Sequence, residues 1–156
     1  MTSQDAGFEG PLQARLDDAI AQQDIIFKDT FPGMLGVRIT EAREGFAAAE
    51  LDVGPQVRHP GGYAHGGAVA GFGDTVAAWA TFPSLAVDET FTTIEFKTNF
   101  ITGVTDGALR GEARVVHKGG RTMVLDVRIT SGEKLVAVML VTQAILKSKP
   151  PEQPRP

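Results

Sequence analysis

The segment "HPGGYAHGGAVAGFGDTVAAWATF", residues 59–82, constrains the fold of this 156-residue chain more than any other feature. It begins as a glycine-rich turn and becomes an apolar run whose single charged side chain is Asp74. Steps of about 100° per residue along a helix separate its side chains into two unlike faces. The large apolar face has Val69, Phe72, Val76 and Trp79, and the small face has Gly67, Ala70, Gly71, Asp74, Ala77 and Ala78. We therefore predict a central helix that is covered on both sides.

Alternating apolar and polar residues predict strands before and after this helix. The predicted strands hold Leu35, Val37 and Ile39; Ala49, Leu51 and Val53; Ile94, Phe96 and Phe100; Leu109, Ala113 and Val115; and Met123, Leu125, Val127 and Ile129. The stretch "HKGGRT" reads as the hairpin turn before the last of these. A sixth strand, "KLVAVMLVTQAIL", is almost wholly apolar, which is typical of a central strand buried on both faces.

The N-terminal region predicts one further helix. Leu12, Leu16, Ile20 and Phe27 recur near helical spacing between polar neighbours. We expect an α+β fold, in which an antiparallel sheet wraps around a central helix, with an additional N-terminal helix. The expected boundaries are a flexible N-terminus over residues 1–10, a single domain over 11–147 and a disordered proline-rich tail over 148–156.

Composition narrows the class of protein. A formal charge of −4 argues against a general binder of nucleic acid. The chain has no cysteine, which excludes disulfides, thiolate nucleophiles and cysteine-based metal sites. Neither a signal peptide nor an apolar run of membrane-spanning length is evident, so we expect a cytoplasmic protein that does not enter a membrane.

Asp74 needs a reason to lie on a covered helix, because an unpaired carboxylate there is costly. No lysine or arginine occurs between Arg58 and Lys97, so no ion-pair partner is near in sequence. One interpretation is a structural acid bonded to backbone groups or hydroxyls. The other is a chemical role, since isolated acids in closed sites have shifted proton affinities that serve reactions.

The start of the helix supplies a second candidate group. Gly66 and Gly67 follow His65 and leave backbone N–H groups free to bind a developing oxyanion, unless they serve only to make the entry turn. Eight residues at about 1.5 Å each separate Gly66 from Asp74 by roughly 12 Å. A single site that uses both groups therefore needs one from each of two subunits, with two helices side by side across a two-fold axis.

These residues resemble a known family. The H-G-G sequence with an acid nine positions after the histidine, "TTIEFKTNF" and "HKGGRT" are similar to the hotdog-fold acyl-CoA thioesterases, in particular the PaaI-like, phenylacetate-pathway branch. The resemblance extends over residues 33–146. It implies a dimer, usually assembled further into a tetramer, with two active sites at each dimer interface.

The resemblance also implies roles for individual residues. Asp74 is the general base or nucleophile, and the N–H of Gly66 polarises the thioester carbonyl. His65 orients the loop. Thr93 helps to position water, with Thr92 as the alternative if the register shifts by one.

His59 departs from the family, which commonly has Asn or Gln six residues before the motif histidine. An imidazole can still donate a hydrogen bond to the thioester carbonyl or hold water. The alternative is an ordinary loop residue beside Pro60.

Further candidates for substrate binding are Gly67 and the hairpin residues Lys118, Gly119 and Arg121, whose cations suit the phosphates of coenzyme A. Arg114 and Lys97 are additional options, and solvated surface charges are the alternative. His59, His65 and His117 are the only histidines, and we expect neither a metal nor another cofactor.

Two other functions fit parts of the pattern. "RHPGG" before a helix resembles the hotdog dehydratases of fatty-acid synthesis, and a hotdog module that binds acyl-CoA without hydrolysing it is the second alternative. The sequence does not decide whether the acyl group of the substrate is aryl or medium-chain aliphatic. Candidates for lining its pocket are Tyr63, Phe72, Trp79, Phe82 and Phe91.

Overall fold

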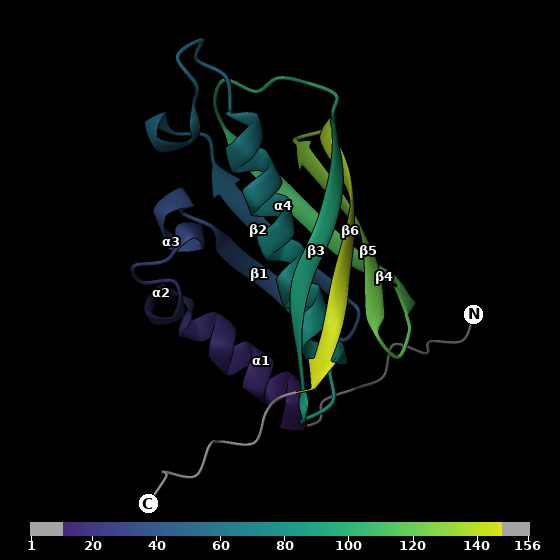
Figure 1. Ribbon diagram of the computed structural model, residues 1–156. Helices are drawn as coiled ribbons and strands as arrows, with labels where there is room; N and C mark the ends of the chain where they lie inside the picture. The colour runs from purple at the N-terminus through teal and green to yellow at the C-terminus, as the bar shows by residue number, and fades with distance from the viewer. Residues whose placement is uncertain (1–10, 148–156) are drawn as a thin grey trace, which may run out of the picture.

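The computed structural model describes residues 11–147, which form a six-stranded antiparallel sheet and a long helix packed against one face of it (Figure 1). The strands are β1 (Arg38–Arg43), β2 (Phe46–Asp52), β3 (Glu89–Phe100), β4 (Ala108–Lys118), β5 (Thr122–Ser131) and β6 (Lys134–Lys147), in the order β1-β2-β4-β5-β6-β3. The long helix is α4 (Gly66–Thr81), and short 3-10 turns, η1 (Pro55–Val57) and η2 (Phe82–Ser84), flank it. The expected α+β fold with a central helix is confirmed. The expectations for residues 1–10 and 148–156 lie outside the described residues.

The core lies between α4 and the sheet, as the two-faced pattern of the helix predicts. Phe72 and Val76 are fully buried, and so are the four inward-facing residues of β5, Met123, Leu125, Val127 and Ile129. Gly111 on β4 permits close packing, because a Cβ there would come within 2.9 Å of the Phe72 ring. Burial of these large side chains removes apolar surface from water and stabilises the helix on the sheet.

The N-terminal region differs from the predicted single helix. It forms α1 (Pro11–Ala21), α2 (Gln23–Ile26) and α3 (Phe31–Leu35), which lie on the β1 side of the molecule (Figure 1). Leu35 was expected in a strand, but it ends α3. Gly36 then adopts a left-handed φ of 82°, which stops the helix, and β1 begins two residues later. The alternation of Leu35 with Val37 resembles a strand pattern although a helix ends between these residues, so the strand prediction for Leu35 is wrong.

The prediction that β6 is buried on both faces is wrong. The strand lies between β5 and β3, and its inward residues Met139 and Val141 are buried, whereas Leu140 is 51% exposed on the outer face. None of the helices described over residues 11–147 covers that face (Figure 1). β6 is therefore buried on one face only, and the apolar residues on its outer face led to the wrong prediction.

Strand β3 forms an edge of the sheet and also departs from simple alternation. The register shifts between Thr93 and Glu95, so a bulge at Ile94 changes the face on which the following side chains lie. Phe96 is 44% exposed although it shares its face with the buried Val141 opposite. Within residues 11–147, the other side of β3 has no neighbouring strand. None of the helices described over 11–147 is both long and apolar enough to cross a bilayer.

Candidate active site

The structure joins two of the predicted site residues directly. The hydroxyl of Thr93 on β3 donates a 2.9 Å hydrogen bond to Oδ1 of Asp74 on α4. Burial raises the pKa of Asp74 above its ordinary value, and the hydrogen bond from Thr93 offsets part of that rise. No cation of residues 11–147 pairs with Asp74, and its Oδ2 has no donor in the same range. Thr92, the alternative, is exposed on the opposite face of the strand.

A buried amide supports this pair, and sequence reasoning missed it. Gln143 on β6 is completely buried, and its Nε2 lies 3.5 Å from the Thr93 hydroxyl. Its Oε1 accepts a 2.5 Å hydrogen bond from Thr81 at the end of α4. The available signal was a lone Gln on the inward side of an apolar strand, since Gln143 has the same parity as Met139 and Val141.

The start of α4 is organised by its cap residue. The Nδ1 of His65 accepts a 2.9 Å hydrogen bond from the N–H of Gly67, so His65 is the N-cap and Gly67 serves the cap. The N–H of Gly66 has no acceptor within residues 11–147. The ring of Phe100 lies over Gly66, where a Cβ would come within 3.1 Å of the ring. The first turn of the helix therefore presents an unpaired N–H beside an aromatic side chain.

His59 lies in the same region. His59, Gly66, Val69 and Phe100 are among the residues that line a cleft of about 350 Å³ at the start of α4. The Nδ1 of His59 accepts a 2.9 Å hydrogen bond from the N–H of Gly61, which assigns the proton of a neutral ring to Nε2. The ring stacks on Tyr63 at 5.9 Å and lies 6.3 Å from the His65 ring. The Nε2–H of His59 is thus available to donate a hydrogen bond.

The predicted residues therefore form two separate groups within one chain. Gly66 and His59 line the cleft, whereas Asp74 and Thr93 are absent from its lining. About two helical turns separate the groups along α4.

Two of the predicted hairpin residues contact other groups of the same chain. Lys118 donates a hydrogen bond to the carbonyl of Ser84 in η2, and Gly119 closes the turn through its N–H to the carbonyl of Thr122. Arg121 is exposed. Among residues 11–147, no three side chains of the metal-binding types gather into a possible metal site.

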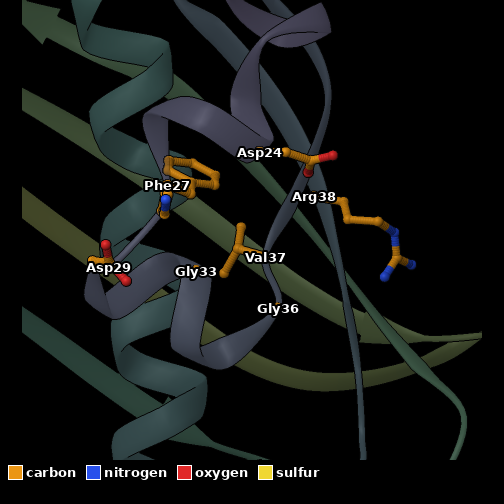
Figure 2. Close-up of a pocket in the computed structure, with 8 residues that line it drawn as sticks. Asp24, Phe27, Asp29, Gly33, Gly36, Val37 and Arg38 are labelled. Carbon is orange, nitrogen blue, oxygen red and sulfur yellow. The ribbon is translucent and has the colours of Figure 1, made fainter.

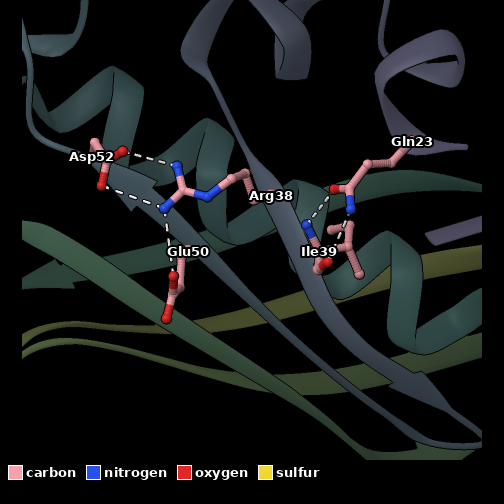
Figure 3. A network of polar contacts seen from close by, with 5 residues as sticks. All are labelled: Gln23, Arg38, Ile39, Glu50 and Asp52. Atoms are coloured by element: carbon pink, nitrogen blue, oxygen red, sulfur yellow. Dashed lines mark hydrogen bonds and ion pairs between the residues drawn. The ribbon is translucent and has the colours of Figure 1, made fainter. Parts of the chain in front are cut away.

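A second cavity, of about 410 Å³, lies between α2, α3 and β1 and contains none of the predicted site residues (Figure 2). Arg38 at its rim is bound to Asp52 at 2.8 Å and to Glu50 at 3.4 Å (Figure 3). Gln23 joins α2 to β1, because its amide both accepts from the Ile39 N–H at 2.6 Å and donates to the Ile39 carbonyl at 3.1 Å (Figure 3). The Gln23 contacts attach α2 to the sheet, whereas the Arg38 ion pairs join β1 to β2 within it.

Comparisons with known proteins place the chain in a family. The Thioesterase superfamily model matches residues 61–138, which include Gly66, Asp74 and Thr93. Putative esterase ComA2 of Bacillus subtilis (strain 168) is 30% identical over 124 residues, which cover 77% of this chain and 97% of that protein. The 1,4-dihydroxy-2-naphthoyl-CoA hydrolase of Listeria monocytogenes serotype 1/2a (strain 10403S) is 28% identical over 116 residues, covering 74% of this chain and 94% of that protein.

Among solved structures, the E. coli PaaI protein from the phenylacetic acid degradation operon has the same fold. Its TM-score is 0.76 at 23% sequence identity, and the match covers 88% of this chain and 98% of that one. The resemblance to the hotdog-fold thioesterases is confirmed, and the chain belongs to the thioesterase superfamily.

Proposed function

We propose that this protein hydrolyses an acyl-CoA thioester to a carboxylic acid and free coenzyme A. The observation that carries the proposal is Asp74, a partly buried acid on a helix face of small residues. Its one hydrogen-bond partner within residues 11–147 is a hydroxyl, and its second oxygen is free. The Listeria relative, by its name, acts on a CoA thioester.

The reaction needs a nucleophile and a proton carrier. As a general base, the Asp74 carboxylate takes a proton from water while the water oxygen attacks the carbonyl carbon. The C–S bond then breaks, and the thiolate of coenzyme A takes up the proton held by Asp74. As a nucleophile, the carboxylate attacks the carbonyl carbon, the C–S bond breaks and the thiolate of coenzyme A leaves. Water then hydrolyses the resulting anhydride, which restores the Asp74 carboxylate, releases the carboxylic acid and supplies the proton that the thiolate takes up. Both routes use the free Oδ2, while Thr93 holds Oδ1.

The oxyanion that forms in either route needs donors. The unpaired N–H of Gly66 is one, and Nε2–H of His59 is the second, because both line the same cleft. His65 holds the first turn of α4 in place. Arg121 and Lys118, with the turn at Gly119, are the proposed contacts for the phosphates of coenzyme A.

A complete site requires two chains, because Gly66 and Asp74 lie about 12 Å apart on one helix axis. We propose a homodimer in which Asp74 of one chain faces Gly66 of the other. The free edge of β3 and the exposed side chains of Ile94 and Phe96 beside it favour this strand as the interface. Further assembly into a tetramer rests on the family resemblance.

Release of free thiol from a panel of aryl and aliphatic acyl-CoAs tests the proposal. Asp74→Asn retains the shape of the side chain and removes the acid. Asp106→Asn is a matched control, because Asp106 also accepts a hydrogen bond from a threonine, Thr105, at 3.0 Å but is exposed. We expect turnover by the wild type and the control, and a loss of at least 100-fold in kcat for Asp74→Asn. Binding of acyl-CoA without thiol release by the wild type would contradict hydrolysis and favour a binding module.

A further inference from the structure

A series of hydrogen bonds leads from the C-terminal end of α4 back to Asp74. At the end of the helix, the Thr81 hydroxyl lies 2.5 Å from Oε1 of Gln143 on β6. On the other side of the same amide, Nε2 lies 3.5 Å from the hydroxyl oxygen of Thr93, which donates to Oδ1 of Asp74 at 2.9 Å. Thr81 and Gln143 are completely buried. We call this series, Thr81–Gln143–Thr93–Asp74, the hydrogen-bond relay.

The direction of each bond in the relay follows from the number of protons available. An amide oxygen only accepts, so the contact between Thr81 and Gln143 uses the hydroxyl proton of Thr81, although the Ala77 carbonyl lies 3.0 Å from the same hydroxyl. Since Oε1 faces Thr81, the amide presents Nε2, which only donates, to Thr93. The single proton of the Thr93 hydroxyl is then left for Asp74. Every donor in the relay therefore points toward the acid.

We infer that Thr81 and Gln143 are positioning residues, which direct the Thr93 hydroxyl proton onto the Asp74 carboxylate. With the amide turned so that Oε1 faced Thr93, the hydroxyl would have two acceptors for one proton, and Gln143 would compete with Asp74. Thr81 prevents this turn, because within residues 11–147 it is the donor that Oε1 has. Bonds that point in one direction also polarise and strengthen one another. The catalytic meaning of the relay rests on the proposed function, in which Thr93 holds Oδ1 of the reacting acid.

No charged side chain of residues 11–147 faces Asp74 in place of the relay. α3 has no charged residue, and the arginines and acids of β1, β2, β4 and β5 form ion pairs with one another. The charged residues of β3 and β6 are Glu89, Glu95, Lys97, Lys134 and Lys147. Glu95 accepts a hydrogen bond from Thr142 on the outer face, and Lys97 lies opposite the outward-facing Leu140. The other three lie at the ends of their strands.

Thr81→Val tests the relay at the end farthest from the acid. Valine retains the branched shape of threonine but leaves Oε1 of Gln143 buried without a donor, which costs free energy. The Thr93 hydroxyl is the other donor beside this amide. We therefore expect the amide to turn in Thr81→Val and to take the Thr93 proton away from Asp74.

Two further variants show whether the hydroxyl at position 81 is the cause. Thr81→Ser restores the hydroxyl. Thr75→Val is the matched control, because Thr75 donates to the Gly71 carbonyl of the same helix at 2.8 Å and has no bond to Gln143.

The measurement is the pH titration of the Asp74 carboxyl carbon by carbon NMR, with Asp74→Asn to assign the signal. We expect Thr81→Val to move the titration to higher pH, because the carboxylate loses the bond that stabilises its charged form. The shift should reach at least roughly half of that in Thr93→Val, which removes the same bond outright. Thr81→Ser and Thr75→Val should keep the wild-type titration. For an acyl-CoA that the wild type hydrolyses, the acidic limb of kcat/KM against pH should move with the titration.

A double variant separates the relay from a direct effect of position 81. Gln143→Met removes the amide, so no acceptor competes with Asp74 for the Thr93 proton. Thr81→Val should therefore shift the Asp74 titration in the wild-type background and leave it unchanged in the Gln143→Met background. An equal shift in the two backgrounds would overturn the relay.

The outcomes separate this inference from the proposed function. An Asp74 titration that is the same in Thr81→Val and the wild type overturns the inference and leaves hydrolysis standing if thiol is released. Absence of thiol release from every acyl-CoA contradicts the proposed function, whereas the NMR titration still decides the inference. Circular dichroism and a thermal melt show that each variant is folded. Thr81→Ala, which also lacks the hydroxyl, takes the place of Thr81→Val if valine prevents folding.

Discussion

The Thr93 hydroxyl and the Asp74 carboxylate are 19 residues apart in sequence and 2.9 Å apart in space. Their hydrogen bond joins the edge strand to the central helix. It also opposes burial, which raises the pKa of Asp74, by stabilising the charged carboxylate. The same bond therefore positions the acid and limits the change in its proton affinity.

Thr93→Val should move the acidic limb of the pH profile to higher pH. The Asp74 carboxylate must be ionised to act, and loss of the Thr93 hydrogen bond removes the one interaction that lowers its pKa. The measurement is kcat/KM against pH for an acyl-CoA that the wild type hydrolyses. Thr92→Val, on the other face of the strand, is the control and should keep the wild-type limb. A limb that moves to lower pH would contradict the assignment of Asp74 as the ionising group.

Asp74→Asn should make the folded protein more stable at neutral pH. Burial in the folded state raises the pKa of Asp74 above its ordinary value of 3.8, which applies in the unfolded chain. The folded protein therefore keeps the proton on Asp74 to higher pH than the unfolded chain does. Between these two pKa values the folded state binds more protons, and the free energy of unfolding falls as pH rises. Urea unfolding at several pH values should show the advantage of the variant at pH 7 and its decrease toward pH 4. A stability advantage of Asp74→Asn that grows as the pH falls would contradict a raised pKa of Asp74 in the folded state.

Gln143→Leu should weaken both stability and activity. The change leaves the Thr81 hydroxyl without its buried acceptor and removes the amide beside Thr93, at a cost of about 1–3 kcal/mol in the free energy of unfolding. Chemical denaturation measures the first effect and kcat the second. Thr142→Val tests the neighbouring outward-facing position, where the hydrogen bond to Glu95 is exposed, and it should change little. Equal losses in the two variants would show that Gln143 has no special role.

Gly61→Ala should displace His59. A Cβ at position 61 would come within 2.6 Å of Cε1 of the imidazole, whose Nδ1 now accepts the Gly61 N–H. Loss of a preorganised donor predicts roughly a tenfold to hundredfold fall in kcat/KM. Gly120→Ala is the matched control, because a Cβ there meets nothing within 4 Å. Nitrogen NMR of the labelled imidazole should show the Nε2–H form in the wild type, and the opposite tautomer would contradict His59 as a donor through Nε2.

Complementation tests whether the site uses two chains. Asp74→Asn and His59→Ala homodimers should each have little activity. After the two are unfolded together and refolded, half of the dimers are mixed, and one of the two sites in each mixed dimer has both native residues. Activity should return to about one quarter of the wild-type value. If both residues act within one chain, mixing restores nothing.

The sequence alone determined the fold class and most of the strand assignment, because helical and strand periodicities are local properties of the chain. The face of small residues around Asp74 was likewise readable from spacing, whereas the cap formed by His65, which occupies the Gly67 N–H that the sequence left free, was not. Local patterns misled where an element ended or a face was uncovered, as at Leu35, which ends a helix, and in β6, whose outer apolar residues face no layer.

Only the tertiary structure decided which hydroxyl meets Asp74, since the bulge at Ile94 and the pairing of β3 with β6 set that geometry. It also brought Gln143 beneath the pair and Phe31 over Gly71. These contacts join residues far apart in the chain. They depend on how the sheet and helices pack against one another. Periodicity in a single sequence reports only local structure and therefore cannot predict these contacts.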